Sequence, residues 1–276
     1  MMTITDAQVH IWSADSPSRP WPEYGHSYAH GDELLGEQML ARMSDAGVDR
    51  AVLVPPSWEG DRNDVCLAAA QAHPKQFAVM GRLPIELDES RDLAEEWLNQ
   101  PGMIGVRLTF HRNFQRQWLR DGTADWFWAA AERVGIPVMV FVPGSIPEIG
   151  AIAEKHPDLR LVIDHLGLFG TLDEELPKRL KPTLELARYP NVAVKASCMP
   201  NLVTEPYPFV TLQSAIEEVV AAFGPQRTFW GSDVSRLTCP LRECVTLFTE
   251  QCKTLTDDDK RWIMGHGIAE WLNWKE

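Results

Sequence analysis

Short apolar runs recur along the chain, and polar loops separate them from longer stretches with helical periodicity. Each run is rich in Val, Ile, Leu or Met, which is typical of parallel strands that are buried on both faces. The pattern predicts eight strands, at residues 3–10, 50–55, 76–82, 103–109, 136–141, 159–165, 191–197 and 227–233.

The stretches between these strands predict helices at residues 32–46, 63–72, 90–99, 124–134, 147–155, 172–188, 209–223, 241–252 and 256–271. Asp32 and Thr123 are candidate N-caps of two of these helices, and Gly47 and Gly135 are candidate left-handed residues at their ends. The last helix begins with the Thr-x-x-Asp spacing of a capping box at residues 256–259.

Strand and helix alternate eight times, which is the signature of a (β/α)8 TIM barrel, an α/β fold. The length of 276 residues suits one such barrel, so we predict a single domain over residues 1–276. A doubly wound open sheet is the alternative that the same alternation allows.

The composition narrows the partners of the protein. A formal net charge of −13 without a basic cluster argues against nucleic acid and leaves a small-molecule substrate as the expected partner. No apolar stretch is long enough to cross a membrane, and no secretory signal is evident, so we expect a cytoplasmic protein. The five cysteines have no CxxC spacing and predict neither disulfides nor a thiolate metal site. Whether the chain forms a homo-oligomer is left open.

Chemically active side chains fall at the ends of the predicted strands, where a barrel of this type builds its active site. Strand one ends at His10, and Gln8 shares its face because residues two apart in a strand point the same way. Strand six ends at His165 and strand eight at Asp233. These groups can act as general acid and base or as metal ligands. A buried carboxylate such as Asp233 is costly unless it is paired or functional.

Two cations belong to the same rim. Arg107 lies in strand four and Lys195 in strand seven. Either side chain could hold a substrate carboxylate or stabilise an oxyanion, and either could instead be the ion-pair partner of an acidic residue.

Aromatic residues follow the first two strands. Trp12 and Trp58 are candidate walls for a flat, partly apolar substrate, although tryptophans of such a barrel also pack between strands and helices. The loop at residues 13–31 is long for its position, so we expect it to help cover the site. It also contains Trp21, Tyr24, Tyr28, His26 and His30, and the later rim loop contains His111.

Three motifs resemble those of the amidohydrolase-related proteins of the amidohydrolase superfamily. Residues 6–12, Asp-Ala-Gln-Val-His-Ile-Trp, resemble that family's strand-one pattern Asp-x-His-x-His-x-Trp. Residues 162–167, Val-Ile-Asp-His-Leu-Gly, resemble its strand-six motif, and residues 229–233 end in its strand-eight Gly-[Ser/Thr]-Asp. Weaker similarities lie at residues 105–107, 191–195 and 269–272. The matches span nearly the whole chain in the right order, and the most similar branch is that of the 2-pyrone-4,6-dicarboxylate and sugar-lactone hydrolases.

The chain departs from the family pattern where metal-dependent members bind their ion. Gln8 stands where the first histidine is usual, and strand five has no histidine. The resemblance therefore implies either an enzyme without a cofactor or a single divalent ion, zinc or manganese, held by His10, His165 and Asp233.

The resemblance implies a hydrolase that opens a lactone of a small carboxylated or aromatic-derived metabolite, in catabolism. In this hypothesis Asp233 is the general base for a water molecule, and His10 and His165 polarise the carbonyl. Arg107 or Lys195 binds a substrate carboxylate, and Gln8 orients the water or the ring oxygen. The alternatives are a metal-dependent decarboxylase, a hydrolase of C–N bonds, and a barrel that binds without catalysis.

Overall fold

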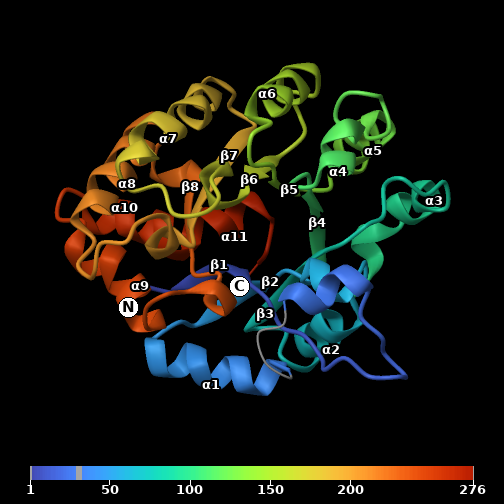
Figure 1. Cartoon of the computed structure of the whole chain (residues 1–276), viewed down its shortest axis with the longest axis horizontal. Coiled ribbons are helices and arrows are strands. Elements are labelled where there is room, and N and C mark those ends of the chain that lie inside the picture. The colour runs from blue at the N-terminus through green and yellow to red at the C-terminus, as the bar shows by residue number, and fades with distance from the viewer. Residues whose placement is uncertain (1, 29–32, 276) are drawn as a thin grey trace.

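Eight parallel strands form the centre of the computed structural model, which describes residues 2–28 and 33–275 (Figure 1). They follow one another around the sheet in chain order as β1 (Thr5–Val9), β2 (Arg50–Leu53), β3 (Phe77–Gly81), β4 (Met103–Thr109), β5 (Val138–Phe141), β6 (Leu161–Ile163), β7 (Val192–Ser197) and β8 (Thr228–Gly231). Each strand lies within its predicted range, so the prediction of eight strands is confirmed.

Hydrogen bonds beyond the end of β8 join it to β1. The Ser232 N–H donates to Asp6 Oδ1 at 2.8 Å, and the Asp233 N–H donates to the carbonyl oxygen of Gln8 at 2.9 Å. Burial raises the pKa of Asp6 to about 6 despite the hydrogen bonds from Ser232 and Gln8. The TIM barrel is therefore confirmed, and the open doubly wound sheet is excluded.

Helices surround the barrel (Figure 1). They are α1 (Gly36–Ala46), α2 (Asp64–Ala72), α3 (Ser90–Glu95), α4 (Asn113–Trp118), α5 (Asp125–Val134), α6 (Ile146–Lys155), α7 (Leu176–Leu184), α8 (Val210–Phe223), α9 (Leu241–Thr246), α10 (Asp257–Arg261) and α11 (Gly267–Trp271). The pattern of apolar residues did not predict α4. The last predicted helix is interrupted by a π-helical turn, Trp262–His266, between α10 and α11.

The predictions for the C-terminal ends of the helices are confirmed more often than those for the N-terminal ends. Gly47 and Gly135 both have left-handed backbones, and Thr256 and Asp259 form the predicted capping box. Thr123 is not a cap, because α5 begins at Asp125 and no side chain caps it. Asp32 lies outside the described residues, and α1 begins at Gly36.

Apolar side chains fill the lower part of the barrel. Seven strands contribute to this cluster through Ala7, Val52, Ala78, Met80, Met139, Val162, Ala193 and Phe229, and the C-terminal segment closes it with Ile268, Leu272 and Trp274. A larger apolar layer lies between strands and helices. The packed floor leaves the carboxyl ends of the strands as the place for a cavity.

Candidate active site

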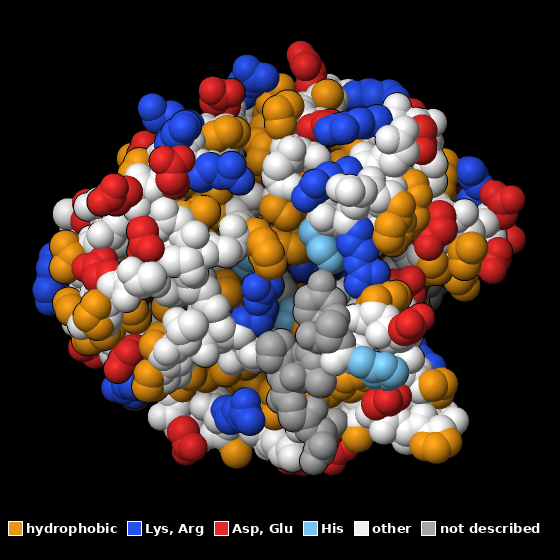
Figure 2. Space-filling model, in the orientation of Figure 1, with side chains coloured by type: hydrophobic (Ala, Val, Ile, Leu, Met, Phe, Trp, Pro, Cys, Tyr) orange, Lys and Arg blue, Asp and Glu red, His pale blue; other side chains and the backbone are white. Residues whose placement is uncertain are grey.

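A cavity of about 190 Å³ opens at the carboxyl ends of the strands. Figure 2 shows the hollow at the centre of this face, with histidine and arginine side chains gathered around it. Its lining comprises His10, Ser57, Trp58, Arg107, Thr109, His111, Phe141, His165, Phe169, Asp233 and Arg236. The cavity thus brings together five predicted site residues that lie far apart in the sequence: His10, Trp58, Arg107, His165 and Asp233.

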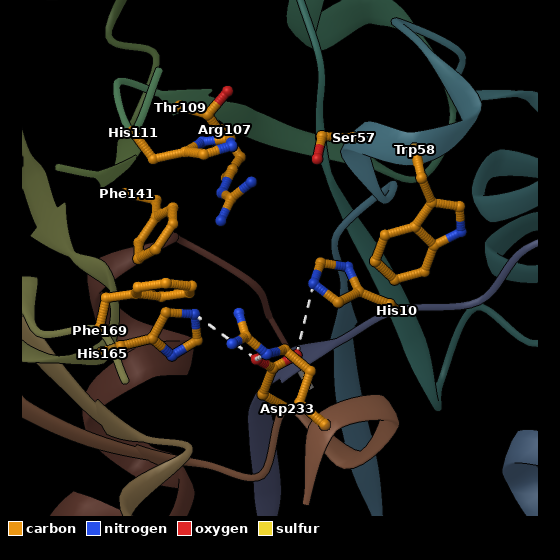
Figure 3. A pocket seen from close by; sticks show the side chains of 11 residues that line it. His10, Ser57, Trp58, Arg107, Thr109, His111, Phe141, His165, Phe169 and Asp233 are labelled. Carbon is orange, nitrogen blue, oxygen red and sulfur yellow. Dashed lines mark ion pairs between the residues drawn. The ribbon is translucent and has the colours of Figure 1, made fainter. Parts of the chain in front are cut away.

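Asp233 lies between two imidazoles (Figure 3). Its Oδ1 is 3.4 Å from His10 Nε2, and its Oδ2 is 3.7 Å from His165 Nε2. Within the described residues neither oxygen has a hydrogen-bond partner, although the side chain is almost fully buried. Burial alone would raise the pKa of Asp233, but the imidazoles and nearby arginines bring this pKa below its usual value. The result is an ionised and unsatisfied carboxylate at the cavity floor.

His10 is held by the backbone of the neighbouring strand. Its Nδ1 lies 2.6 Å from the carbonyl oxygen of Val54, which can only accept, so Nδ1 carries a proton. Burial lowers the pKa of His10 to about 4. The ring is therefore neutral at pH 7, and its Nε2 presents a lone pair to Asp233 and Gln8.

His165 reaches the cavity through an unusual backbone turn. It follows β6 with a left-handed backbone (φ 52°), and its Nδ1 lies 2.8 Å from the hydroxyl oxygen of Ser197. Burial lowers the pKa of His165 to about 4 as well. When the Ser197 hydroxyl donates to Nδ1, Nε2 carries the ring proton and faces the cavity as a donor.

A second polar layer lies directly beneath the cavity. Arg107 Nε donates to Asp164 Oδ2 at 2.9 Å, and Lys195 Nζ lies 2.6 Å from Asp164 Oδ1. Burial opposes the charge of Asp164, but Lys195 and Arg107 together lower the pKa of that carboxyl to about 2. The guanidinium of Arg107 nevertheless points into the cavity (Figure 3). Arg107 is thus both an ion-pair partner and a cavity residue.

Three predicted substrate contacts lie outside the cavity lining. Lys195 and Gln8 are fully buried below it, where the Lys195 ammonium donates to Gln8 Oε1. Trp12 is buried behind Trp58 and packs edge-on against it, with the ring centroids 5.5 Å apart. Trp58 itself lines the cavity and contacts His10 edge-on. The three buried residues therefore support the cavity from behind.

Six cavity residues had no role assigned from the sequence: Ser57, Thr109, His111, Phe141, Phe169 and Arg236. His111 was noted only as a residue of a rim loop, and Phe141, Phe169 and Arg236 were not singled out. Phe141 and Phe169 pack against each other at 5.9 Å, and Arg236 lies over the Phe169 ring at 5.0 Å. Arg236 is three residues beyond Asp233 in a 3-10 turn, Val234–Arg236. That spacing after a strand-end aspartate is the signal that could have identified it.

The long loop after β1 borders a neighbouring hollow. Tyr24 lines a second cavity of about 200 Å³, which shares Arg107 and Thr109 with the first. The Arg112 guanidinium lies 3.8 Å from the centre of the Tyr24 ring. His26 pairs with Asp15 at 3.0 Å, and His30 lies outside the described residues. The prediction that this loop covers the site itself stays a prediction.

The family model described as Amidohydrolase matches residues 5–274. The chain belongs to the amidohydrolase family. The resemblance predicted from the strand-end motifs is confirmed.

Relatives of similar sequence include two lactonases. An L-fucono-1,5-lactonase from Burkholderia ambifaria is 29% identical over 243 residues, which are 84% of this chain and 81% of the relative. An L-fucono-1,5-lactonase from Burkholderia multivorans is 24% identical over 252 residues, 83% of this chain and 80% of the relative.

Solved amidohydrolases share the fold. An amidohydrolase from Burkholderia multivorans with bound zinc has a TM-score of 0.83 at 20% identity, covering 98% of this chain and 99% of that one. A probable 2-pyrone-4,6-dicarboxylic acid hydrolase from Acinetobacter baumannii, with citric acid bound, has a TM-score of 0.76 at 18% identity. The match covers 99% of this chain and 100% of that one.

The donor set of this amidohydrolase does not fit a metal ion well. In residues 2–28 and 33–275, no three His, Cys, Asp or Glu side chains are arranged to hold one. The oxygen of Gln8 is engaged by Lys195, and the amide nitrogen lies 3.4 Å from His10 Nε2. An amide nitrogen is a donor and cannot ligate a cation. The two buried cations, Lys195 and Arg107, further disfavour a third positive charge at this place.

Proposed function

We propose that this amidohydrolase hydrolyses the lactone ring of a small carboxylated metabolite. The observation that supports this proposal is the carboxylate of Asp233, which is buried, ionised and without a hydrogen-bond donor at the floor of the cavity. A carboxylate in that state readily accepts a proton from a water molecule at its side. The two lactonases among its relatives support the same chemistry.

Asp233 and His10 together define where the attacking water would lie. Asp233 offers the free acceptor, because the Nε2 lone pair of His10 already faces the Gln8 amide donor. A water molecule beside the His10 ring would donate to Asp233 and direct its own lone pair into the cavity. Asp233 then takes the proton as the water attacks. This geometry gives His10 the role of positioning the water, rather than the carbonyl polarisation expected from the sequence.

Arg107 and His165 are the groups that would stabilise the oxyanion. The Arg107 guanidinium points into the cavity from the side opposite Asp233, and His165 faces it from the turn after β6 (Figure 3). Fixed donors at a site where negative charge develops stabilise the transition state more than the ground state. Asp233, protonated by the attacking water, can return that proton to the leaving oxygen when the ring opens.

The walls of the cavity support a small, flat and anionic substrate. Trp58, Phe141 and Phe169 supply apolar faces, and Arg236 supplies a cation that is one-third exposed at the mouth. A volume of about 190 Å³ suits a substrate of one ring with short substituents. The probable 2-pyrone-4,6-dicarboxylic acid hydrolase is named for a substrate of this kind, whereas the L-fucono-1,5-lactonases are named for a neutral sugar lactone.

The test is a screen for ring opening with and without a chelator. Aldonolactones, 2-pyrone-4,6-dicarboxylate and a neutral lactone would be followed by proton release, with Asp233→Asn as the inactive control. The expected result is that one class of lactone is opened at the same rate with and without the chelator. Opening that needs zinc or manganese would assign His10, His165 and Asp233 to a metal ion instead. Release of carbon dioxide from an aromatic acid, without any lactone opening, would replace the proposal by a decarboxylase.

A further inference from the structure

Lys195 places a fixed positive charge at the centre of the barrel. Its side chain is fully buried, and its ammonium lies 2.6 Å from Asp164 Oδ1. It donates to Gln8 Oε1, to the carbonyl oxygen of Ala7 at 3.3 Å and to Met139 Sδ at 3.1 Å. Partners from β1 and β5 and from the residue after β6 thus surround one cation on β7. Such a group has no route to solvent and does not contact the substrate cavity.

Gln8 connects this cation to the catalytic layer. Because its oxygen accepts from Lys195, its amide nitrogen turns towards His10, and the two Nε2 atoms are 3.4 Å apart. His10 donates its own proton to Val54 on the other side of the ring. The order Asp164–Lys195–Gln8–His10 therefore alternates acceptors and donors without a conflict. It leaves His10 with a single consistent tautomer.

We propose that the Lys195–Gln8 pair replaces an active-site metal ion in this chain, holding His10 in its Nδ1–H tautomer and excluding divalent ions. The proposal rests on the lactone hydrolysis proposed above only for its catalytic consequence. Gln8 stands where the family pattern has a histidine, so a ligand has become an amide whose oxygen needs a donor. Lys195 supplies that donor, and it also supplies a positive charge that, unlike a bound metal ion, cannot dissociate from the protein. Both are positioning residues, because neither touches the cavity.

Zinc uptake tests the exclusion of metal directly. After incubation with zinc and exhaustive dialysis, the wild-type chain should retain far less than one ion per chain by mass spectrometry. The double variant Gln8→His with Lys195→Met removes the cation and restores an imidazole, so it should retain about one ion, held by three protein ligands. The matched control is Gln71→His with Lys178→Met, whose sites are exposed on α2 and α7. A folded double variant that takes up no more zinc than the wild type would overturn the proposal.

Nitrogen-15 NMR of the histidine rings tests the positioning role without turnover. In the wild type, His10 should show a protonated Nδ1 and an unprotonated, hydrogen-bonded Nε2. Gln8→Leu removes the donor, so the Nε2 resonance of His10 should shift and its tautomers should mix. Gln8→Asn, with a shorter amide, should restore part of the wild-type signal. A His10 spectrum that is the same in Gln8→Leu and the wild type would contradict the proposal.

These two readouts separate this inference from the proposed function. Neither uses a substrate, so both can succeed in a protein that opens no lactone. If lactones are opened but the wild-type chain binds one zinc ion that His10→Gln removes, the inference about Lys195 and Gln8 fails while the hydrolase function stands.

Discussion

The Asp164 carboxylate lies 2.6 Å from the Lys195 ammonium, and both side chains are shielded completely from solvent. The same carboxylate also accepts from Arg107 at 2.9 Å. One anion therefore balances two buried cations, and the remaining positive charge lies below Asp233. That excess helps to keep Asp233 ionised and is available to an oxyanion in the cavity.

Replacing Asp164 should destabilise the protein strongly. Asp164→Asn leaves Arg107 and Lys195 buried without a counter-charge, and such uncompensated charges cost about 3–5 kcal/mol. Urea unfolding would measure the loss. Asp88→Asn is the matched control, because that side chain is 98% exposed and pairs only loosely with Arg91. A loss of stability no larger than that of the control would show that Asp164 is dispensable to the buried layer.

Removing the charge of Asp233 should abolish most turnover. Asp233→Asn cannot take a proton from water, so kcat/KM should fall by about 10²–10⁴-fold, the usual contribution of a general base. Substrate binding should change little, which equilibrium titration with the substrate or its ring-opened product would show. Activity close to that of the wild type would assign the role of base to another group.

Arg236 should discriminate between charged and neutral lactones. The guanidinium is the most exposed cation of the cavity lining, so it is well placed to meet a carboxylate at the mouth. Arg236→Gln should raise KM for a carboxylated lactone by about 10-fold, the worth of one charge-assisted hydrogen bond. KM for a neutral lactone of the same ring should not move. An equal effect on both would indicate that Arg236 only packs on Phe169.

Acid should destabilise the fold between pH 6.5 and pH 4. Burial lowers the pKa of His10 and of His165 to about 4, so the unfolded chain binds their protons first and stability is lost as the pH falls. Asp6 opposes this, because its pKa is raised to about 6 and its native proton adds stability below that pH. Because the two imidazoles outweigh the one carboxyl, the free energy of unfolding should fall by about 3 kcal/mol over this pH range.

Urea unfolding at pH 6.5, 5 and 4 would measure this loss. The double variant His10→Gln with His165→Asn retains Asp6 and should show a flat or inverted dependence over the same range. Stability of the wild type that rises on acidification would refute the assignment of neutral, buried imidazoles.

The sequence predicted the barrel well because its strands are short apolar runs that alternate with helices. It also predicted that His10, His165 and Asp233 meet in one cavity, since each follows a strand and the barrel brings strand ends together. Their catalytic roles stay predictions. The Thr123 cap was predicted wrongly, because α5 begins two residues later, at Asp125, and Thr123 lies in the turn before it, where its N–H donates to Asp121 Oδ1 at 3.0 Å. Local propensity does not reveal where such a turn gives way to the helix.

Less could be predicted about the layers above and below the strand ends. Lys195 was expected at the substrate, but it is two residues short of the end of β7, and that places it one layer deeper in the barrel. Phe169 and His111 lie on loops whose path depends on tertiary packing, so no periodic pattern marks them. Cytoplasmic location, catabolic role and oligomeric state stay predictions. Within the described residues, no helix is long and apolar enough to cross a membrane.

The left-handed backbone at the strand exits limits how this site can change by mutation. His165 and Asp233 both have positive φ angles, and so does Cys198 just after β7. Most side chains pay about 1–2 kcal/mol in that region, whereas Asn and Asp tolerate it through local hydrogen bonds. Most single substitutions at residue 233 should therefore destabilise the backbone, whatever their effect on catalysis. New activities in this barrel should arise more easily from the walls, at residues such as Phe169, than from its floor.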